Sequence, residues 1–450
     1  MITMPAQAAY MIEKLNTAGH RAYAVGGCVR DGLLGIAPKD WDLCTSARPE
    51  EMQAIFADCH VVETGLKHGT LTVVLDHVPY EVTTFRVDGA YTDHRHPDGV
   101  TFVTDVREDL ARRDFTVNAM AYHPREGVID AFGGMDDLRR GVIRCVGDAR
   151  TRFTEDALRI LRALRFAATY DFTVEGETAF AAREMAHTLT GVAQERIRTE
   201  IGKMLCGRAA GKILRAFPDV LAVCLPEIAP MFGFEQHTPY HRYDVWEHTI
   251  RAVEHVPPVE ALRLAMLLHD SGKPRAFTMD ERGVGHAHGH QRESALLAEA
   301  ALTRLRVDNA TAERVLTLVK HHDMPLAEDA KMIRRRLHQF GEETLRQLID
   351  IQRGDAYGKG TLTPGEIEAQ YRATVAAVEE VLAQQPCVTL KQLAVNGRDM
   401  TGLGLRGKAI GACLDALLND VMDERAANVR EELLLRARRW MEENTGRQDA

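Results

Sequence analysis

Apolar and polar positions alternate over short distances in the first third of the chain. Such alternation over about four to eight residues predicts β-strands with one buried face. Residues 49–58 instead repeat their apolar positions at a helical spacing and carry a proline in the expected first turn, which is typical of a helix start. The runs that predict strands are residues 22–27, 40–45, 69–76, 80–86 and 99–104.

After Thr151 the strand signals almost vanish, and long helical periods replace them. A proline-rich stretch at residues 217–234 and a second break at residues 358–366 interrupt the helical pattern. The pattern predicts an α+β protein, with a mixed β-sheet in an N-terminal head and an elongated all-α body. The domains that we expect are residues 1–150, 151–225, 226–360 and 361–450.

The composition narrows the class of protein. Of the 450 residues, 45% are hydrophobic, which is ordinary for a globular protein. The N-terminal segment lacks the basic and apolar regions of a signal peptide, and the apolar runs are too short for a membrane span. Eight cysteines without CxxC spacing favour a reducing cytoplasm. The net charge of −9 does not favour a nucleic-acid partner, but RNA binding needs only a local basic surface.

Two aspartates, Asp40 and Asp42, lie two positions apart in a predicted strand. Residues i and i+2 of a strand point to the same face, so both carboxylates can be directed at one point. Their repulsion favours bound cations, and hard oxygen ligands suit Mg²⁺. Two such ions can stabilise the attacking and leaving oxygens of a phosphoryl transfer. On a neighbouring predicted strand, Glu81 fits the place of a third ligand better than Asp76.

The segment before these aspartates adds a candidate phosphate site. Gly26 and Gly27 end the first predicted strand and let the backbone approach a ligand closely. The helix predicted from Val29 has N-terminal amides that suit a phosphate, and Arg30 can add charge-assisted hydrogen bonds. A strand edge with solvated aspartates is the alternative interpretation, and the glycines with Arg30 favour the nucleotide site over it.

The segment after Thr154 predicts an amphipathic helix. Thr154 is a favourable N-cap, and the helix dipole favours an acidic residue such as Asp156 in the first turn. Asp156 and Arg159 lie one turn apart and present an acceptor and a fork of donors. Such a pair can satisfy the amine and ring nitrogen of cytosine or adenine. A charged, solvated helix face is the alternative interpretation.

These features occur together in a known family. The chain resembles the class II nucleotidyltransferases of the polymerase β superfamily, which are the tRNA nucleotidyltransferases and bacterial poly(A) polymerases. Residues 26–42 match their signature, GGxVRD followed after eight residues by DxD. Four more blocks follow in family order within about the first 210 residues. They are residues 80–103, 111–122, 155–166 and 195–205.

The resemblance implies a polymerase-β-like nucleotidyltransferase head that adds or repairs the 3′-terminal CCA of tRNA. CTP and ATP would be the substrates, and pyrophosphate would be released. Asp40, Asp42 and Glu81 would be catalytic, with Mg²⁺ held by Asp40 and Asp42. The intact segment at residues 86–97 favours complete CCA addition or terminal A addition over CC addition, and the wording ARRDFTVNAMAY at residues 111–122 favours tRNA over poly(A) synthesis.

The resemblance also implies how the nucleotide is selected. Asp156 and Arg159 would act as a protein template that selects CTP and then ATP. Arg162 and Arg165 would hold phosphate or support that pair, and Arg113 would contact the nucleotide. The nucleotide-binding residues that we expect are Gly26, Gly27, Arg30, Arg113, Asp156, Arg159, Arg162 and Arg165.

Histidines concentrate between residues 237 and 338. Their ordered pattern, with HDSGKP at residues 269–274, resembles the HD superfamily of metal-dependent phosphohydrolases. Imidazole with carboxylate suits Mn²⁺, Ni²⁺, Fe²⁺ or Zn²⁺ better than Mg²⁺ alone. The resemblance implies phosphatase or 2′,3′-cyclic phosphodiesterase activity, and a metal site retained for structure is the alternative. The expected ligands are His248, His269, Asp270, His290, His322 and Asp355, and His286, His288 and His321 could substitute.

The expected partners are tRNA, ATP and CTP, with no DNA and no membrane, for a cytoplasmic monomer or dimer. The helices after residue 367 resemble the family's tRNA-binding tail. Rival interpretations are a poly(A) polymerase, an A-adding enzyme, an HD phosphohydrolase whose head only binds RNA, and an RNA-binding scaffold. The dinucleotide fingerprint GLGLRG at residues 402–407 lacks a βαβ unit, so we interpret it as a turn before a helix.

Overall fold

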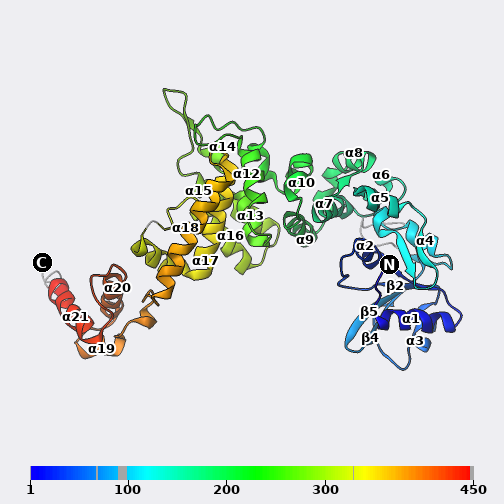
Figure 1. Ribbon diagram of the computed structural model, residues 1–450, viewed down its shortest axis with the longest axis horizontal. Coiled ribbons are helices and arrows are strands. Elements are labelled where there is room, and N and C mark those ends of the chain that lie inside the picture. Colours follow the sequence, from blue (N-terminus) through cyan, green and yellow to red (C-terminus); the bar gives the residue numbers. More distant parts are fainter. Residues whose placement is uncertain (1, 67–68, 90–98, 328, 446–450) are drawn as a thin grey trace. The chain divides into compact units, whose positions relative to one another are not determined.

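The computed structural model describes residues 2–66, 69–89, 99–327 and 329–445. The chain forms two compact units. The first comprises Met1–Ala229 with Ala301–Val307, and the second comprises Pro230–Ala300 with Asp308–Ala450. The sheet belongs to the N-terminal part of the chain, and long helices dominate the rest (Figure 1). The predicted division into four domains stays a prediction. Within the described residues, none of the helices combines the length and apolarity that crossing a bilayer requires.

A seven-stranded sheet forms the head, in the order β3-β4-β5-β2-β1-β8-β9. Strands β2 and β5 run parallel, and the other neighbours run antiparallel, so the predicted mixed sheet is confirmed. The strands of this sheet are β1 (Ala22–Val25), β2 (Leu43–Thr45), β3 (His60–Gly65), β4 (Thr70–Leu75), β5 (Val78–Thr84), β8 (Met120–His123) and β9 (Gly127–Asp130).

Alternation along β5 shows how the sequence orients the sheet. Tyr80, Val82 and Thr84 are buried, whereas Glu81 between them is exposed. The side chains of a strand point alternately to opposite faces, so burial of the apolar set directs Glu81 to solvent. The remaining head elements are α1 (Ala6–Thr17), α2 (Gly27–Leu33), α3 (Pro49–Ile55), β6 (Arg86–Asp88), β7 (Val100–Phe102), α4 (Val106–Ala111), the 3₁₀ helix η2 (Thr116–Asn118) and α5 (Gly134–Arg140).

In the head, one expected strand begins later than predicted and one expected segment is only partly described. The predicted strand at residues 40–45 is wrong in its first half, because β2 begins only at Leu43 and both aspartates precede it. The segment at residues 86–97, which favours complete CCA addition, lies outside the described residues from residue 90 onward.

The helical neck of the first unit begins with two short helices rather than one. We expected Thr154 to cap a helix, but it lies inside α6 (Ala149–Glu155), which Asp148 caps by accepting a hydrogen bond from the Thr151 amide. Asp156 has extended backbone angles and accepts from the Leu158 amide at the start of α7 (Leu158–Tyr170). The predicted N-cap is therefore wrong, because an earlier aspartate competes for that role.

Further elements of the neck are β10 (Val142–Ile143), β11 (Thr173–Val174), α8 (Gly176–Glu184), η3 (Ala186–Gly191), α9 (Gln194–Leu205), α10 (Ala210–Ala216), α11 (Pro218–Cys224) and η4 (Pro226–Met231). Helix α7 packs against α9 and buries Leu158, Ile160, Leu161 and Leu164. This apolar stripe leaves the arginines of α7 on its other side.

The second unit is mainly helical. Helix α12 packs against α13 and α17, and α17 also contacts α18. The turn expected at residues 402–407 is confirmed, because α19 ends at Gly402 and α20 begins at Lys408. The elements are α12 (Val245–Glu254), α13 (Glu260–Leu268), α14 (Lys273–Ala276), β12 (Thr278–Met279), β13 (Gly285–His286), α15 (His290–Arg304), α16 (Asn309–His321), α17 (Ala330–Lys359), α18 (Pro364–Ala383), η5 (Leu390–Gln392), α19 (Gly397–Gly402), α20 (Lys408–Met422) and α21 (Arg430–Thr445).

Candidate active site and candidate metal centre

The head gathers three carboxylates at the start of β2. The Val25 amide donates to the Asp42 carbonyl over 2.9 Å, which ties this residue to the end of β1. In the parallel pairing of β2 with β5, Leu43 lies opposite Val82, so the preceding residues Asp42 and Glu81 are brought together. Asp40, Asp42 and Glu81 are all exposed. The predicted proximity of Asp42 to Glu81 thus follows from strand register.

Charge makes this cluster suited to a cation. Burial raises the pKa of Asp42, the negative charges of Glu81 and Asp40 raise it further, and Arg113 acts in the opposite direction. The Asp42 carboxylate therefore contacts solvent but is less hydrated than a carboxylate on an open surface. A divalent cation would relieve the repulsion. The oxygens of the three carboxylates do not all lie within 4.8 Å of one another, so the cluster is less tightly assembled than the second site described below.

Arg113 lies between this cluster and the glycine turn. Gly26 has a φ of +82°, and a Cβ added there would lie 2.8 Å from Nη1 of Arg113. Nη2 of Arg113 lies 3.5 Å from Asp109, and its buried Nε makes no hydrogen bond. A side chain at position 26 would thus displace the guanidinium, and an anionic group could satisfy the unbonded donor.

Arg30 is more deeply engaged than the sequence suggested. Its guanidinium is buried against the rings of Phe166 and Tyr170, at 5.0 and 4.7 Å from their centroids. Nη1 donates to Asn118 over 2.5 Å, and Nε donates to Asp31 over 2.9 Å. These contacts point to Arg30 as a residue that positions the start of α2, and its contact with a triphosphate stays a prediction.

The expected selecting pair lies at the break between α6 and α7, and each member has another partner. Asp156 accepts from both terminal nitrogens of Arg196, at 3.4 and 2.8 Å. Arg159 donates to Glu155 over 2.5 Å and to the backbone carbonyls of Arg152 and Arg112. Asp156 precedes α7 with extended backbone angles and Arg159 lies in the first turn of α7, so the pair does not lie on one continuous helix as expected. The two side chains do not bond each other among the described contacts. Sequence reasoning missed Arg196, whose signal was its place at the start of the 195–205 block.

Arg162 and Arg165 serve the packing of α7. Arg162 donates to Asp114 Oδ2 through Nε and Nη2, at 2.9 and 2.6 Å. Burial alone would raise the pKa of Asp114, but Arg162 and Asn118 lower it to about 2. Arg165 donates to Glu200 on α9 over 2.5 Å. These pairs favour the supporting role over direct contact with phosphate.

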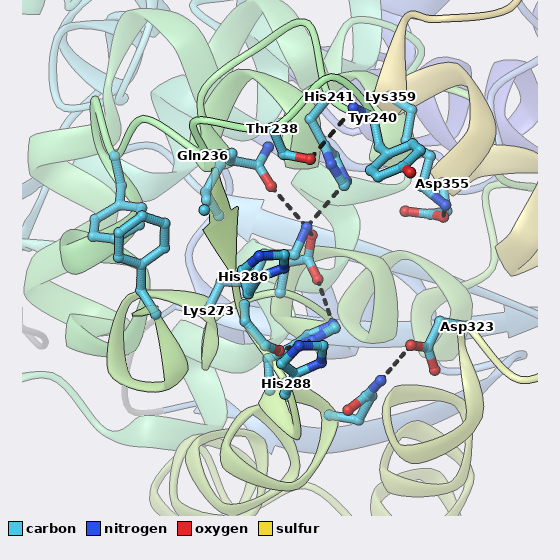
Figure 2. A pocket seen from close by; sticks show the side chains of 18 of the residues that line it. Gln236, Thr238, Tyr240, His241, Lys273, His286, His288, Asp323, Asp355 and Lys359 are labelled. Carbon is cyan, nitrogen blue, oxygen red and sulfur yellow. Dashed lines mark hydrogen bonds and ion pairs between the residues drawn. The ribbon is translucent and has the colours of Figure 1, made fainter. Parts of the chain in front are cut away.

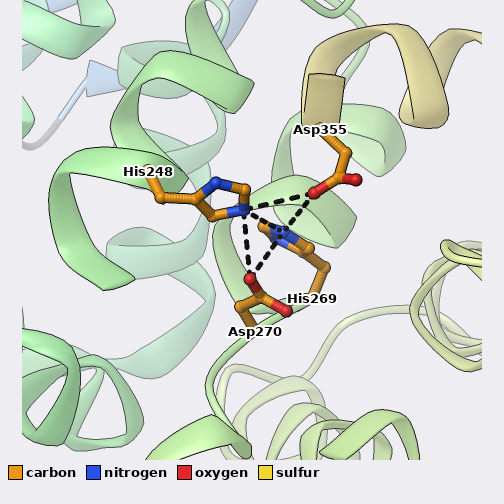
Figure 3. Close-up of side chains that lie close together, drawn as sticks. All are labelled: His248, His269, Asp270 and Asp355. Atoms are coloured by element: carbon orange, nitrogen blue, oxygen red, sulfur yellow. Dashed lines mark hydrogen bonds and ion pairs between the residues drawn. The ribbon is translucent and has the colours of Figure 1, made fainter. Parts of the chain in front are cut away.

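The second site, in the helical unit, brings all six expected HD residues together. Four of them form one group whose ligand atoms lie within 4.8 Å of one another (Figure 3). Asp270 also belongs to a second such group. The first group comprises His248, His269, Asp270 and Asp355, and the second comprises Asp270, His290 and His322.

The two oxygens of Asp270 face different groups. Oδ2 lies 3.0 Å from Nε2 of His248 and 3.3 Å from Nε2 of His269. Oδ1 lies 3.2 Å from Nε2 of His290 and 3.6 Å from Nε2 of His322. Both oxygens are buried without a hydrogen bond, although Lys273 Nζ lies 2.6 Å from Oδ2. This donor set fits two divalent ions bridged by one carboxylate.

Backbone contacts orient three of the imidazoles. Nδ1 of His269, His290 and His322 lies 2.7–2.9 Å from the carbonyl oxygen three residues earlier. A carbonyl can only accept, so Nδ1 carries the proton and Nε2 is left as the ligand atom. The same contact occurs at the ends of α13 and α16 and at the start of α15.

The buried charges of this site depend on one another. Burial would lower the pKa of His269, but Asp270 and Asp355 raise it to about 9. Burial and His269 lower the pKa of His322 to about 4. Lys359 Nζ lies 2.5 Å from Asp355 and is the strongest charge that keeps this carboxylate ionised. The site therefore retains anionic carboxylates at neutral pH.

The site opens into a pocket of about 310 Å³ (Figure 2). His286 and His288, two of the expected substitutes, line it, as does His241, which sequence reasoning did not single out. His321 instead packs against the ring of Phe340, with centroids 4.9 Å apart. Lys273 donates to Gln236 over 2.8 Å at the pocket wall.

Three known families match consecutive parts of the chain. "Poly A polymerase head domain" matches residues 22–144, and "Probable RNA and SrmB- binding site of polymerase A" matches residues 171–231. "HD domain" matches residues 239–358, which contain every ligand of the second site.

Curated relatives match about half of the chain. The CCA-adding enzyme of Leuconostoc mesenteroides subsp. mesenteroides is 50% identical over 218 residues, which are 48% of this chain and 54% of that protein. The CCA-adding enzyme of Lactobacillus delbrueckii subsp. bulgaricus is 46% identical over 224 residues, which are 50% of this chain and 55% of that protein. The chain thus spans about half the length of the curated relatives that it matches.

Solved structures match the whole chain. The crystal structure of the Bacillus stearothermophilus CCA-adding enzyme in complex with CTP is similar with a TM-score of 0.75 and 30% identity, over 99% of this chain and 100% of that one. The Thermotoga maritima CCA-adding enzyme complexed with tRNA has a TM-score of 0.60 and 21% identity, over 98% of this chain and 97% of that one. At this lower identity the likeness concerns the fold.

Proposed function

The chain belongs to the family of CCA-adding enzymes, and we propose that it adds or repairs the 3′-terminal CCA of tRNA without a template. Its substrates would be CTP and ATP, with release of pyrophosphate. The observation that carries this proposal is the exposed cluster of Asp42, Glu81 and Asp40, with Arg113 beside it. The likeness over the whole chain to an enzyme crystallised with CTP supports the same substrate class.

The carboxylates would hold Mg²⁺ ions, which supply charge stabilisation at the attacking 3′-hydroxyl and at the triphosphate. Asp40 and Asp42 are the principal ligands, and Glu81 extends the anionic surface from β5. Arg113 would contact the triphosphate, because its Nε donor has no partner and it lies against Gly26. Arg30 would keep Gly27 and the start of α2 in place for that contact.

Asp156 and Arg159 would select the base. When a nucleotide enters, the acceptor of Asp156 meets the exocyclic amine and the fork of Arg159 meets the ring nitrogen, a pattern that cytosine and adenine share. Uracil and guanine present a carbonyl in place of the amine and would leave the carboxylate unpaired. Arg196, through its bond to Asp156, and Glu155, through its bond to Arg159, would keep both side chains oriented before binding.

The Asp42→Asn variant tests the transferase. Removing one charged ligand should lower nucleotide addition to a tRNA without its CCA end by at least about a hundredfold, since metal charge stabilisation supplies several kcal/mol. Asp76→Asn is the matched control, because Asp76 is an exposed acid at the β4–β5 turn that bonds only the distant Gln7 among the described contacts. Undiminished addition by Asp42→Asn would refute the transferase assignment.

A second activity is favoured by the bridging position of Asp270. We propose that the HD site hydrolyses phosphoesters, as a phosphatase or 2′,3′-cyclic phosphodiesterase acting on damaged 3′ ends. Mn²⁺, Ni²⁺, Fe²⁺ or Zn²⁺ held by its imidazoles and carboxylates would polarise the ester and supply activated water. Asp270 bridges the two ligand groups, and the backbone contacts of the imidazoles keep their Nε2 atoms available.

Hydrolysis of a 2′,3′-cyclic nucleotide with each metal in turn tests this activity. Asp355→Asn should abolish it, because the carboxylate belongs to the first ligand group. His321→Ala is the matched control, since its ring is adjacent to His322 in sequence but packs against Phe340. Equal rates in the wild type and Asp355→Asn would leave only a structural role for the site.

We propose that the protein acts in the cytoplasm, where tRNA, CTP and ATP are available. The C-terminal helices would hold the tRNA through its backbone, and DNA is not an expected partner. A monomer suffices for this arrangement, and a dimer would be equally compatible with it. Incubation with CTP alone and with ATP alone distinguishes complete CCA addition from A-only addition.

A further inference from the structure

The mouth of the HD pocket carries an aromatic ring that is open to solvent. Tyr240 lines the pocket and is 72% exposed, more than any other large hydrophobic side chain in the described part of the chain. A single exposed hydrophobic side chain is ordinary on a protein surface. This one stands at the entrance to a cluster of buried histidines and carboxylates, where a ligand would cover it.

A second set of rings lines the same pocket. His286 and His288 lie parallel, with centroids 5.3 Å apart and an interplanar angle of 9°. His286 is oriented by Asp280, whose carboxylate lies 3.1 Å from Nε2. Phe234 and Phe277 complete the aromatic lining in an edge-to-face contact at 5.3 Å. The outer part of the pocket therefore offers flat, weakly polar surfaces.

The backbone fixes these surfaces relative to each other. The Gly285 amide donates to the His237 carbonyl over 2.7 Å. A Cβ added at Gly285 would lie 2.2 Å from the Gln236 carbonyl oxygen and 2.6 Å from Phe277. Only glycine allows so close an approach. Strand β13, which carries His286, is thus held against residues 236–237, which precede Tyr240.

The inner part of the pocket suits a phosphoryl group. Lys273 and Lys359 line it and pair with Asp270 and Asp355, over 2.6 and 2.5 Å. Gln236 also accepts from Lys273 over 2.8 Å and fixes its position. Lys273 uses its three N–H donors on Asp270, Gln236 and His241, whereas Lys359 bonds only Asp355 among the described contacts and keeps donors that an anion can accept. One end of the pocket therefore suits an anionic group, and aromatic rings line its mouth.

We propose that the aromatic mouth is a nucleobase subsite, in which Tyr240 stacks on the base of a single nucleotide whose phosphate lies at the lysine end. This inference rests on the proposed phosphohydrolase activity and names what it recognises. A volume of about 310 Å³ is at the small end of ligand sites, which suits one terminal nucleotide rather than a longer strand. Stacking on an aromatic ring tolerates any base, so the subsite would distinguish nucleotides from base-free phosphoesters.

The test compares adenosine 2′-monophosphate with glycerol 2-phosphate, which lacks a base, in the full-length protein. In Tyr240→Ala, KM for the nucleotide should rise about 5- to 150-fold, which corresponds to about 1–3 kcal/mol of stacking. Hydrolysis of glycerol 2-phosphate should not change. Tyr240→Phe should behave as the wild type, because the ring is kept. Tyr10→Ala, which removes a 49% exposed tyrosine from α1, is the matched control.

The outcomes separate the inference from the activity on which it rests. Equal KM values for the nucleotide in wild type and Tyr240→Ala would overturn the subsite. If the wild type hydrolyses neither these two compounds nor a 2′,3′-cyclic nucleotide with any of the metals, the phosphohydrolase proposal fails. Equilibrium binding of adenosine 2′-monophosphate then decides the subsite alone, with weaker binding by Tyr240→Ala supporting it and unchanged binding overturning it.

Discussion

Breaking the pair between Asp114 and Arg162 tests whether it holds the selecting segment in place. Asp114 is buried, and its pKa of about 2 lies below the ordinary value of 3.8. That difference corresponds to about 2–3 kcal/mol of stabilisation. Because the folded pKa is depressed, this stabilisation is complete above the unfolded pKa and is lost as pH falls through about 2.

A double-mutant cycle measures the same quantity directly. Asp114→Asn should destabilise the first unit by about 3 kcal/mol, since it leaves Arg162, whose side chain is 33% exposed, without its carboxylate. Asp114→Asn combined with Arg162→Gln should recover part of this loss, with a coupling of about 2–3 kcal/mol. Urea unfolding at neutral pH, with hydrogen exchange followed in residues 158–170, provides both values.

An exposed pair serves as the control for this cycle. Arg150 and Glu184 lie 2.7 Å apart, and both side chains are about half exposed. Glu184→Gln should cost no more than about 1 kcal/mol, because solvent screens the pair. A coupling between Asp114 and Arg162 of no more than about 1 kcal/mol, the value expected for the exposed pair, would refute the view that this ion pair anchors α7.

Three further predictions concern the nucleotide site and the metal centre. Arg196→Ala, which removes the partner of Asp156, should raise incorporation of UTP and GTP relative to CTP and ATP by about tenfold, since bonds to charged groups contribute about 1.5–3 kcal/mol, with Arg196→Lys intermediate. Competition between labelled nucleotides measures this ratio. Gly26→Ala should reduce addition by at least about a hundredfold, because its methyl group would lie 2.8 Å from Arg113 and misplacement of that order disrupts positioning. Gly35→Ala, also at positive φ but in open space, should retain addition in the same assay. Removal of metal by a chelator should lower the unfolding temperature of the second unit, and Mn²⁺ or Ni²⁺ at a hundredfold excess over Kd should restore about 2.7 kcal/mol, measured by calorimetry.

Local patterns were sufficient for the mixed sheet and for the HD ligands. Alternation in residues 80–86 predicted β5. The resemblance to the HD superfamily around His269 and Asp270 implied all six residues that the helices bring together. The double use of Asp270 could not be foreseen, because it depends on how α13 packs against α12 and α16.

Contacts between distant segments could not be predicted. Arg30 donates to Asn118, 88 positions away, and is therefore buried. Thr154 was expected to begin a helix, but Asp148 caps the chain earlier and leaves Asp156 at a break. Local propensity favours several caps in such a segment, and tertiary packing decides among them.

Mapping the products on truncated tRNAs tests directly whether the protein adds the 3′-terminal CCA. The purified protein would receive tRNA that ends before CCA, after the first C or after CC, with CTP and ATP together. We expect each tRNA to be extended as far as CCA and synthesis then to stop, with one pyrophosphate released per nucleotide. A long homopolymer of A, or no extension of any of the three tRNAs, would contradict it.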